Sequence, residues 1–129
     1  MSGTDHSAAV TRVYDVLIAT FPNRPTDRAV DDLQQEILQR MDELNPRGVI
    51  LDISEVTTLD SFFARVIAET ADMVSLMGGE TIVTGMQPSV AITAAELGFG
   101  LGEIETARNT DHALTLLGIQ VEDEDDGDE

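Results

Sequence analysis

Apolar residues recur at steps of three and four between Thr26 and Leu44, and this period is that of one helix face. Thr26 or Asp27 can cap the helix, because a short polar side chain accepts hydrogen bonds from the first free backbone N–H groups. Asn45-Pro46 follows, and proline disfavours a helical conformation at the residue before it. The pattern predicts an amphipathic helix with an apolar stripe of Val30, Leu33, Ile37, Met41 and Leu44.

Shorter runs of apolar residues predict strands on both sides of this helix. Residues 8–21 are rich in β-branched and aromatic side chains, and Tyr14-Asp15 in their middle suits a hairpin turn. The segments 48–53 and 81–84 are almost continuously apolar, which is typical of parallel strands covered on both faces. A short last strand is expected over residues 103–107.

Three further helices are expected, and their starts carry suitable residues. Asp60 and either Asn109 or Thr110 can serve as N-caps, and Pro88 suits a first helical position. The expected ranges are 61 to about 77, 88 to about 97 and about 110–117, with glycines after the first two. The inner face of the 61–77 helix is expected to consist of Phe62, Phe63, Val66, Ile67, Thr70, Val74 and Met77. A hairpin followed by repeating helix–strand units predicts an α/β domain with a mixed, mostly parallel sheet and about four helices.

Length and composition agree with one small globular domain. The chain has 129 residues, of which 42% are hydrophobic, and it contains no cysteine, which excludes disulfides and thiolate chemistry. No apolar run approaches the ~20 residues that span a bilayer. The polar segment 1–9 lacks the basic start and apolar run of a secretory signal, so a cytoplasmic location is expected.

The charge is strongly one-sided. Aspartate and glutamate total 25 against seven arginines, there is no lysine, and the formal net charge is −18. Such a field repels nucleic acids and anionic membranes, so neither is expected as a partner. Part of the excess lies in residues 122–129, EDEDDGDE, and the rest is dispersed over expected helix faces. Dispersed acidity without lysine indicates a halophilic acidic protein, because salt screens the self-repulsion.

No motif for a cofactor, a metal or catalysis stands out. The glycines of segment 98–102 follow a helix rather than a strand, so they are interpreted as a helix-terminating loop and not as a dinucleotide fingerprint. The absence of lysine excludes a P-loop, and there is no nucleophile-elbow motif. His6 and His112 are isolated from other ligand residues, and the acidic tail lacks calcium-loop spacing. We therefore expect no catalytic residues, no bound metal and no cofactor.

One short segment, Leu59-Asp60-Ser61-Phe62, has two interpretations. The simpler is that Asp60 is an N-cap and Ser61 only occupies the first turn, since Asp-Ser before an apolar run is a common helix start. The functional one is that a kinase reaches the serine hydroxyl at the exposed start of a helix. A phosphate there adds about −1.5 to −2 charges, which the helix dipole tolerates but a docked partner surface does not.

The order of elements and the segment GVILDISEVTTLDSFFARVI, residues 48–67, resemble the STAS domain family. The STAS signature pairs an Asp-x-Ser strand end with an Asp-Ser helix start, here Asp52-Ile53-Ser54 and Asp60-Ser61. Within the family the chain is most similar to stressosome scaffolds of the RsbS type, which belong to the anti-sigma factor antagonist superfamily. Further matches to that type are the segments 76–79, 84–88, 96–98 and 103–107. The resemblance implies a STAS domain over residues 8–118. The charge pattern, rather than the resemblance, predicts a disordered acidic tail over 119–129.

The resemblance also implies a function and partners. Scaffolds of this type co-assemble with RsbR-like STAS paralogues and hold an RsbT-like serine kinase, which phosphorylates the scaffold and departs, and a phosphatase resets the complex. Ser61 takes the phosphorylation role here, with Asp60, Ser61 and Phe62 as the partner-binding segment, and Thr93 is a weaker second phosphorylation candidate. Simple anti-sigma factor antagonists read Asp-Ser-Ser-Gly-Leu-Gly at the helix start, whereas this chain reads Asp-Ser-Phe-Phe-Ala-Arg over residues 60–65.

Two other functions stay open beside the non-enzymatic, phospho-switched scaffold. The first is a monomeric binding module that sequesters a regulatory kinase in the manner of an anti-sigma factor antagonist. The second is an enzyme or small-ligand sensor, although the chain has no phosphate loop and no acid–base pair at a telling spacing. Particle size distinguishes the first from the scaffold, and turnover by the isolated chain would reveal the second.

Overall fold

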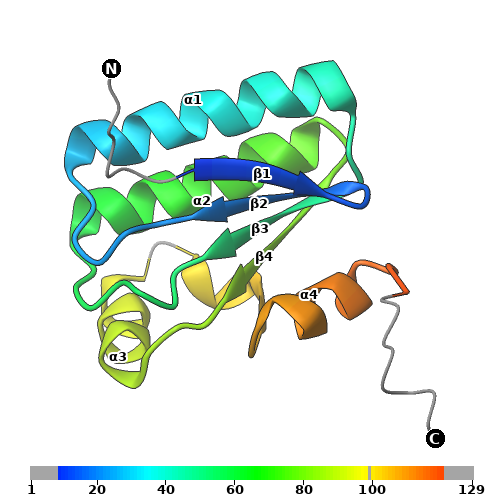
Figure 1. Cartoon of the computed structure of the whole chain (residues 1–129). Helices are drawn as coiled ribbons and strands as arrows, with labels where there is room; N and C mark the ends of the chain where they lie inside the picture. The colour runs from blue at the N-terminus through cyan, green and yellow to red at the C-terminus, as the bar shows by residue number, and fades with distance from the viewer. Residues whose placement is uncertain (1–8, 99, 121–129) are drawn as a thin grey trace, which may run out of the picture.

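A computed structural model describes residues 9–98 and 100–120. Its five strands form one sheet in the order β1-β2-β3-β4-β5 (Figure 1). The strands are β1 (Ala9–Val13), β2 (Val16–Thr20), β3 (Gly48–Asp52), β4 (Glu80–Thr84) and β5 (Glu105–Ala107). The helices are α1 (Asp27–Leu44), α2 (Ser61–Leu76), α3 (Pro88–Leu97), the short 3-10 helix η1 (Leu101–Glu103) and α4 (Thr110–Leu116).

The sheet is mixed, as the sequence predicts. β1 and β2 run antiparallel through a turn at Tyr14, which has a left-handed φ of 56°, and Val13 pairs with Val16. The pairs β2–β3, β3–β4 and β4–β5 are parallel. The parallel connections run through helices, so the predicted α/β class and the N-terminal hairpin are confirmed.

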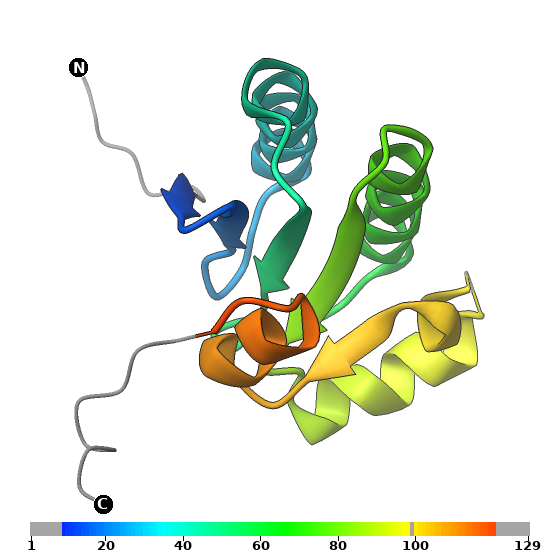
Figure 2. The same ribbon diagram turned by 90° about the vertical axis from the view of Figure 1, so that its right-hand side faces the viewer.

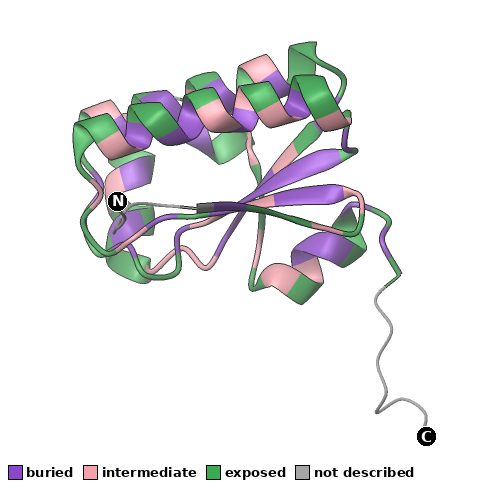
Figure 3. Ribbon diagram, turned by 45° about the horizontal axis from the view of Figure 1, so that its top comes forward, coloured by how far each residue is buried: buried purple, intermediate pink, exposed green. Residues whose placement is uncertain are grey.

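Two layers of helix enclose the sheet. Helices α1 and α2 cover one face and α4 covers the other (Figure 2). The buried side of each long helix faces the sheet, and the outward side is exposed (Figure 3). The larger core lies under α1 and α2 and also includes Val90 and Ala94 of α3. The smaller core joins the sheet to α4 and consists of Val16, Ile50, Ile82, Ala113, Leu114, Leu117 and Ile119.

The first long helix has the predicted bounds and stripe. Thr26 is its N-cap, and the Thr26 Oγ1 atom accepts a hydrogen bond from the Ala29 N–H at 3.0 Å. Asn45 ends the helix in a left-handed conformation with φ 55°. The expected stripe residues are buried in the larger core, apart from Leu44, which is partly buried against it.

Three details of the expected elements are wrong. Residues 101–103 form η1, with the Ile104 N–H donating to the Leu101 carbonyl, so β5 begins at Glu105 rather than at Glu103. Met77 is 40% exposed because α2 ends at Leu76 and Met77 lies in the terminal turn. Phe62 is only partly buried, although it packs against the larger core.

The folded part of the chain continues past α4 to Ile119. Ile119 is buried in the smaller core, and its N–H donates to the Leu114 carbonyl at 2.9 Å. We therefore propose that the folded domain reaches residue 119, one residue beyond the expected boundary.

His6 and the acidic run 122–129 lie outside the described residues. No helix in the described part of the chain is long and apolar enough to cross a membrane.

Candidate functional site at the start of helix α2

Two buried side chains and a cap fix the start of α2. Leu59 and Phe63 are buried in the larger core on either side of the helix start. Between them, the Asp60 carboxylate accepts a hydrogen bond from the Phe63 N–H at 2.8 Å, as an N-cap does. Ser61 is the first residue of the helix and is exposed. The local sequence thus places an accessible hydroxyl at a defined position.

The loop from β3 to α2 is held by hydrogen bonds at its beginning. The Asp52 carboxylate accepts from the Ser54 N–H at 3.0 Å, and the Gln87 side-chain amide donates to the Ser54 carbonyl at 2.9 Å. Gly85 approaches so closely that an added Cβ would lie 2.6 Å from the Ser54 Cβ. The loop before Ser61 is therefore tied to the segment that follows β4.

A second loop, between β2 and α1, lies against the same helix start. The rings of Phe21 and Phe63 have centroids 5.1 Å apart at an interplanar angle of 48°. The Thr57 hydroxyl donates to the Asn23 side-chain oxygen at 2.7 Å, which joins the two loops. Between them lies a cavity of about 330 Å³, lined by Arg24, Pro25, Thr58, Asp60 and Phe63.

Phe62, the aromatic residue after Ser61, is in contact with the guanidinium group of Arg65. The guanidinium carbon of Arg65 lies 5.6 Å from the centroid of the Phe62 ring, within the range of a cation–π contact. Phe62 is partly buried against the larger core, and Arg65 is exposed. The surface at the start of α2 therefore combines a carboxylate, a hydroxyl, an aromatic ring and a guanidinium group.

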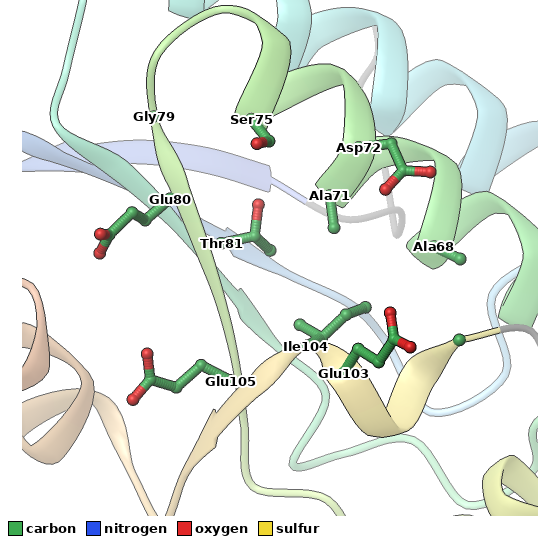
Figure 4. Close-up of a pocket in the computed structure, with 11 residues that line it drawn as sticks. Ala68, Ala71, Asp72, Ser75, Gly79, Glu80, Thr81, Glu103, Ile104 and Glu105 are labelled. Carbon is green, nitrogen blue, oxygen red and sulfur yellow. The ribbon is translucent and has the colours of Figure 1, made fainter.

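A larger hollow lies elsewhere, between α2, η1 and the strands β4 and β5 (Figure 4). Its volume is about 480 Å³, and its lining carries the carboxylates of Asp72, Glu80, Glu103 and Glu105. In the described part of the chain no group of three or more acidic or histidine side chains is arranged to hold a metal ion. The open, acidic lining sets this hollow apart from the start of α2.

Comparison with known proteins settles the family. The family model described as STAS domain matches residues 7–113, which is most of the chain. The chain belongs to the STAS domain family. The fold described above agrees with that assignment, because the predicted five-stranded mixed sheet and four helices are present.

Relatives of this STAS domain include signalling proteins. The RsbT co-antagonist protein RsbRD of Bacillus subtilis (strain 168) is 29% identical over 89 residues, which are 69% of this chain. The chain spans only 32% of the length of that relative. A second relative, the RsbT co-antagonist protein RsbRA of the same strain, is 26% identical over 94 residues, which are 73% of this chain and 32% of that relative.

Solved structures agree closely with this STAS domain. A serine-to-glutamate variant of RsbS from Moorella thermoacetica superimposes with a TM-score of 0.79 at 29% identity, over 86% of this chain and 94% of the other. A chain from the molecular architecture of the stressosome gives a TM-score of 0.76 at 30% identity, over 85% and 96% of the two chains. The resemblance to stressosome scaffolds of the RsbS type, expected from the sequence, is therefore shown.

The structure places the expected site residues of this STAS domain in two regions. Asp60, Ser61 and Phe62 are consecutive at the start of α2, whereas Thr93 lies in the second turn of α3. The Thr93 hydroxyl donates to the Ser89 carbonyl at 3.2 Å, and the side chain is half-buried. Thr93 is therefore less accessible than Ser61.

Reasoning from the sequence missed the basic residues of this region. Arg65 follows Ser61 by four positions, so helical spacing alone was a sufficient signal for it. Arg24 comes from the loop before α1, 37 positions away from Ser61 along the chain. The packing of Phe21 on Phe63 and the Thr57–Asn23 hydrogen bond bring that loop to the site, and no local pattern reveals such contacts.

Proposed function

We propose that this STAS domain is a non-enzymatic, phospho-regulated scaffold that binds and releases a serine kinase in a stress-response complex. Ser61 is the proposed switch. The observation that carries the proposal is the exposed Ser61 hydroxyl at the first position of α2, between the buried anchors Leu59 and Phe63. A kinase can reach this hydroxyl without unfolding the domain.

The proposed partner surface consists of Asp60, Ser61 and Phe62. Phe62 supplies partly exposed apolar area, which favours docking, and Asp60 supplies charge next to the hydroxyl. A phosphate on Ser61 adds about −1.5 to −2 charges beside the Asp60 carboxylate. Removing so much charge from water against a docked partner is costly, so phosphorylation weakens the complex.

The domain itself tolerates the phosphate. Ser61 lies outside the core, and the first turn of a helix favours negative charge because its backbone N–H groups point toward it. The Asp60 cap and the Phe63 anchor do not involve the serine hydroxyl. Phosphorylation is therefore expected to change binding while the fold persists.

The proposed partners follow from the family branch. RsbRD is an RsbT co-antagonist, and a chain of the stressosome resembles this domain over nearly its whole length. By analogy we propose a kinase of the RsbT type, RsbR-like paralogues and a phosphatase as partners, in a cytoplasmic assembly. Thr93 is kept as the weaker second phosphorylation candidate.

The test is a phosphate-transfer assay in high salt. The purified chain is mixed with ATP and an RsbT-type kinase from the same organism, and mass spectrometry locates the phosphate. One phosphate on Ser61, lost in Ser61→Ala and kept in Thr93→Ala, is the expected result. Transfer to another residue, or none at all, would count against Ser61 as the switch.

Particle size separates the scaffold from the monomeric binding module. A mixture with an RsbR-like paralogue is expected to form a particle far larger than the 13.9 kDa chain. A monomer that forms only a one-to-one complex with the kinase would support the binding module instead. Light scattering after size-exclusion chromatography measures either outcome.

A further inference from the structure

Two arginines lie beside the proposed switch. The chain has only seven basic residues, all arginine, against 25 acidic ones, so the positions of its cations are informative. Arg24 lines the cavity of about 330 Å³ together with Asp60, and Arg65 follows Ser61 by one helical turn. Both arginine side chains are exposed.

Neither of these arginines pairs with a carboxylate within residues 9–98 and 100–120, whereas two others do. The Arg40 guanidinium lies 3.5 Å from the Glu36 carboxylate, and that of Arg47 lies 3.6 Å from Asp15. Arg12, Arg28 and Arg108 likewise form no ion pair within these residues, so position beside Ser61, rather than the lack of an ion pair, distinguishes Arg24 and Arg65. Arg24 and Arg65 are therefore available to receive an added anion.

Arg65 approaches the serine along the helix. Residues four positions apart lie on the same face of an α-helix, with Cβ atoms about 6 Å apart. The stacking of Arg65 on the Phe62 ring, 5.6 Å from guanidinium carbon to ring centroid, holds the side chain toward the start of the helix. An arginine is long enough to reach a phosphate ester on Ser61 from there.

Arg24 approaches from the neighbouring loop. The Thr57–Asn23 hydrogen bond of 2.7 Å ties the residue before Arg24 to the segment that leads into α2. Thr58 and Asp60 line the same cavity as Arg24, so Arg24 shares this cavity with the residue that precedes Ser61. The two arginines thus approach the start of α2 from two different elements.

A phosphate on Ser61 needs such donors. The Asp60 carboxylate already accepts the Phe63 N–H at 2.8 Å, and its charge repels a phosphate. Guanidinium groups bind phosphate oxygens through paired, charge-assisted hydrogen bonds. We infer that Arg24 and Arg65 form an internal receptor for the phosphate ester of Ser61, an inference that rests on the proposed phosphorylation.

With this receptor, phosphorylation of Ser61 would change the shape of the partner surface as well as its charge. Binding of the phosphate by Arg24 would add a contact between the start of α2 and the loop between β2 and α1, which already pack together through Phe21 and Phe63. Binding by Arg65 shifts its guanidinium relative to the Phe62 ring, the apolar part of the proposed partner surface. A partner would then meet a rearranged surface as well as a more negative one.

The test measures the ionisation of the phosphate itself. Phosphoserine is installed at position 61 during translation, and ³¹P NMR follows its second ionisation in the native chain and in concentrated urea. We expect a lower pKa for the phosphate in the native chain, because adjacent guanidinium groups favour the dianion. Arg24→Gln and Arg65→Gln should each raise that pKa by about half a pH unit, and the double variant should raise it further.

Arg40→Gln is the matched control, since it removes the same charge at a distance from Ser61 and should leave the phosphate pKa unchanged. A phosphate pKa that is equal in native and unfolded chains, or that responds to neither Arg24→Gln nor Arg65→Gln, overturns the receptor. An equal change of the phosphate pKa in Arg40→Gln also overturns the receptor, since it would show that the pKa responds to the net charge of the chain and not to nearby guanidinium groups. The phosphate is installed without a kinase, so failure of the transfer assay counts against the proposed function alone.

Discussion

Charged residues have different structural roles at the two ends of the parallel strands. At the amino ends of the parallel strands, Arg47 joins three segments. Its N–H donates to the Asp15 carbonyl at 2.9 Å, its guanidinium donates to the Leu117 carbonyl at 3.1 Å, and its own carbonyl accepts from the Glu80 N–H at 3.2 Å. This arginine therefore connects the hairpin, α4 and β4.

At the carboxyl ends, the Asp52 and Asp60 carboxylates hold the backbone, but other polar and charged side chains are exposed. Hydrogen bonds fix the loops at Ser54 and Asn23, and Asp60 caps α2. Ser61 and Arg24 are exposed on the surface beside these hydrogen-bonded loops. The amino ends are thus held together by Arg47, whereas the carboxyl ends present the exposed residues of the proposed switch.

The largest expected effect on stability comes from Gly48→Ala at the structural end. An added Cβ would lie 2.8 Å from the Glu80 carbonyl oxygen and 2.9 Å from a Leu117 methyl carbon. Because both the strand and α4 must shift, the free energy of unfolding should fall by about 2 kcal/mol or more. Urea denaturation measures it. A change below about 0.5 kcal/mol would show that α4 is not packed closely on β3.

Asp60→Ala should have the next largest effect. It removes the acceptor of the Phe63 N–H, and the loss of an N-cap costs about 1 kcal/mol. Asp60→Asn is the matched control, because asparagine also caps helices. If thermal unfolding showed equal destabilisation of both variants, the charge of Asp60 rather than its capping would be responsible.

Arg47→Met should destabilise the domain by about 1 kcal/mol, since it removes a hydrogen bond to Leu117 and a half-exposed ion pair with Asp15. Arg40→Met is the control, as its surface pair with Glu36 contributes little. Kinase affinity should not change in either variant. A loss of kinase affinity in Arg47→Met would contradict the proposal that only the carboxyl ends of the strands contribute to partner binding.

Ser61→Ala should have the smallest effect on stability, within about 0.5 kcal/mol of the parent chain, because the exposed hydroxyl supports no core contact. Chemical denaturation of the two chains side by side measures this difference. A larger loss would indicate that Ser61 has a structural role in the helix start and would favour the simpler interpretation of the Asp-Ser pair.

Much of the fold follows from local patterns. The stripe of α1, its cap at Thr26 and its end at Asn45 are encoded within 20 residues, and the structure confirms them. The start of β5 and the exposure of Met77 are not encoded locally. Both depend on where a turn closes, at Leu101–Ile104 and at the end of α2.

The candidate site was only partly predictable. Asp60 and Ser61 are recognisable because an N-cap and a first helical position are neighbours in the sequence. The cavity with Arg24 depends on the contact between Phe21 and Phe63, which are 42 positions apart, and the role of Arg47 likewise depends on segments distant in sequence. Pairings of this kind arise from the tertiary structure, and periodicity does not reveal them.

The most direct test of the central claim is the affinity of an RsbT-type kinase for three forms of the full chain. The unphosphorylated chain, Ser61→Ala and the chain with phosphoserine at position 61 are titrated by calorimetry in the same salt. The unphosphorylated chain and Ser61→Ala should bind equally, and the phosphorylated chain should bind at least about tenfold more weakly, a difference of ~1.4 kcal/mol. Equal affinity of all three forms would contradict the proposed switch.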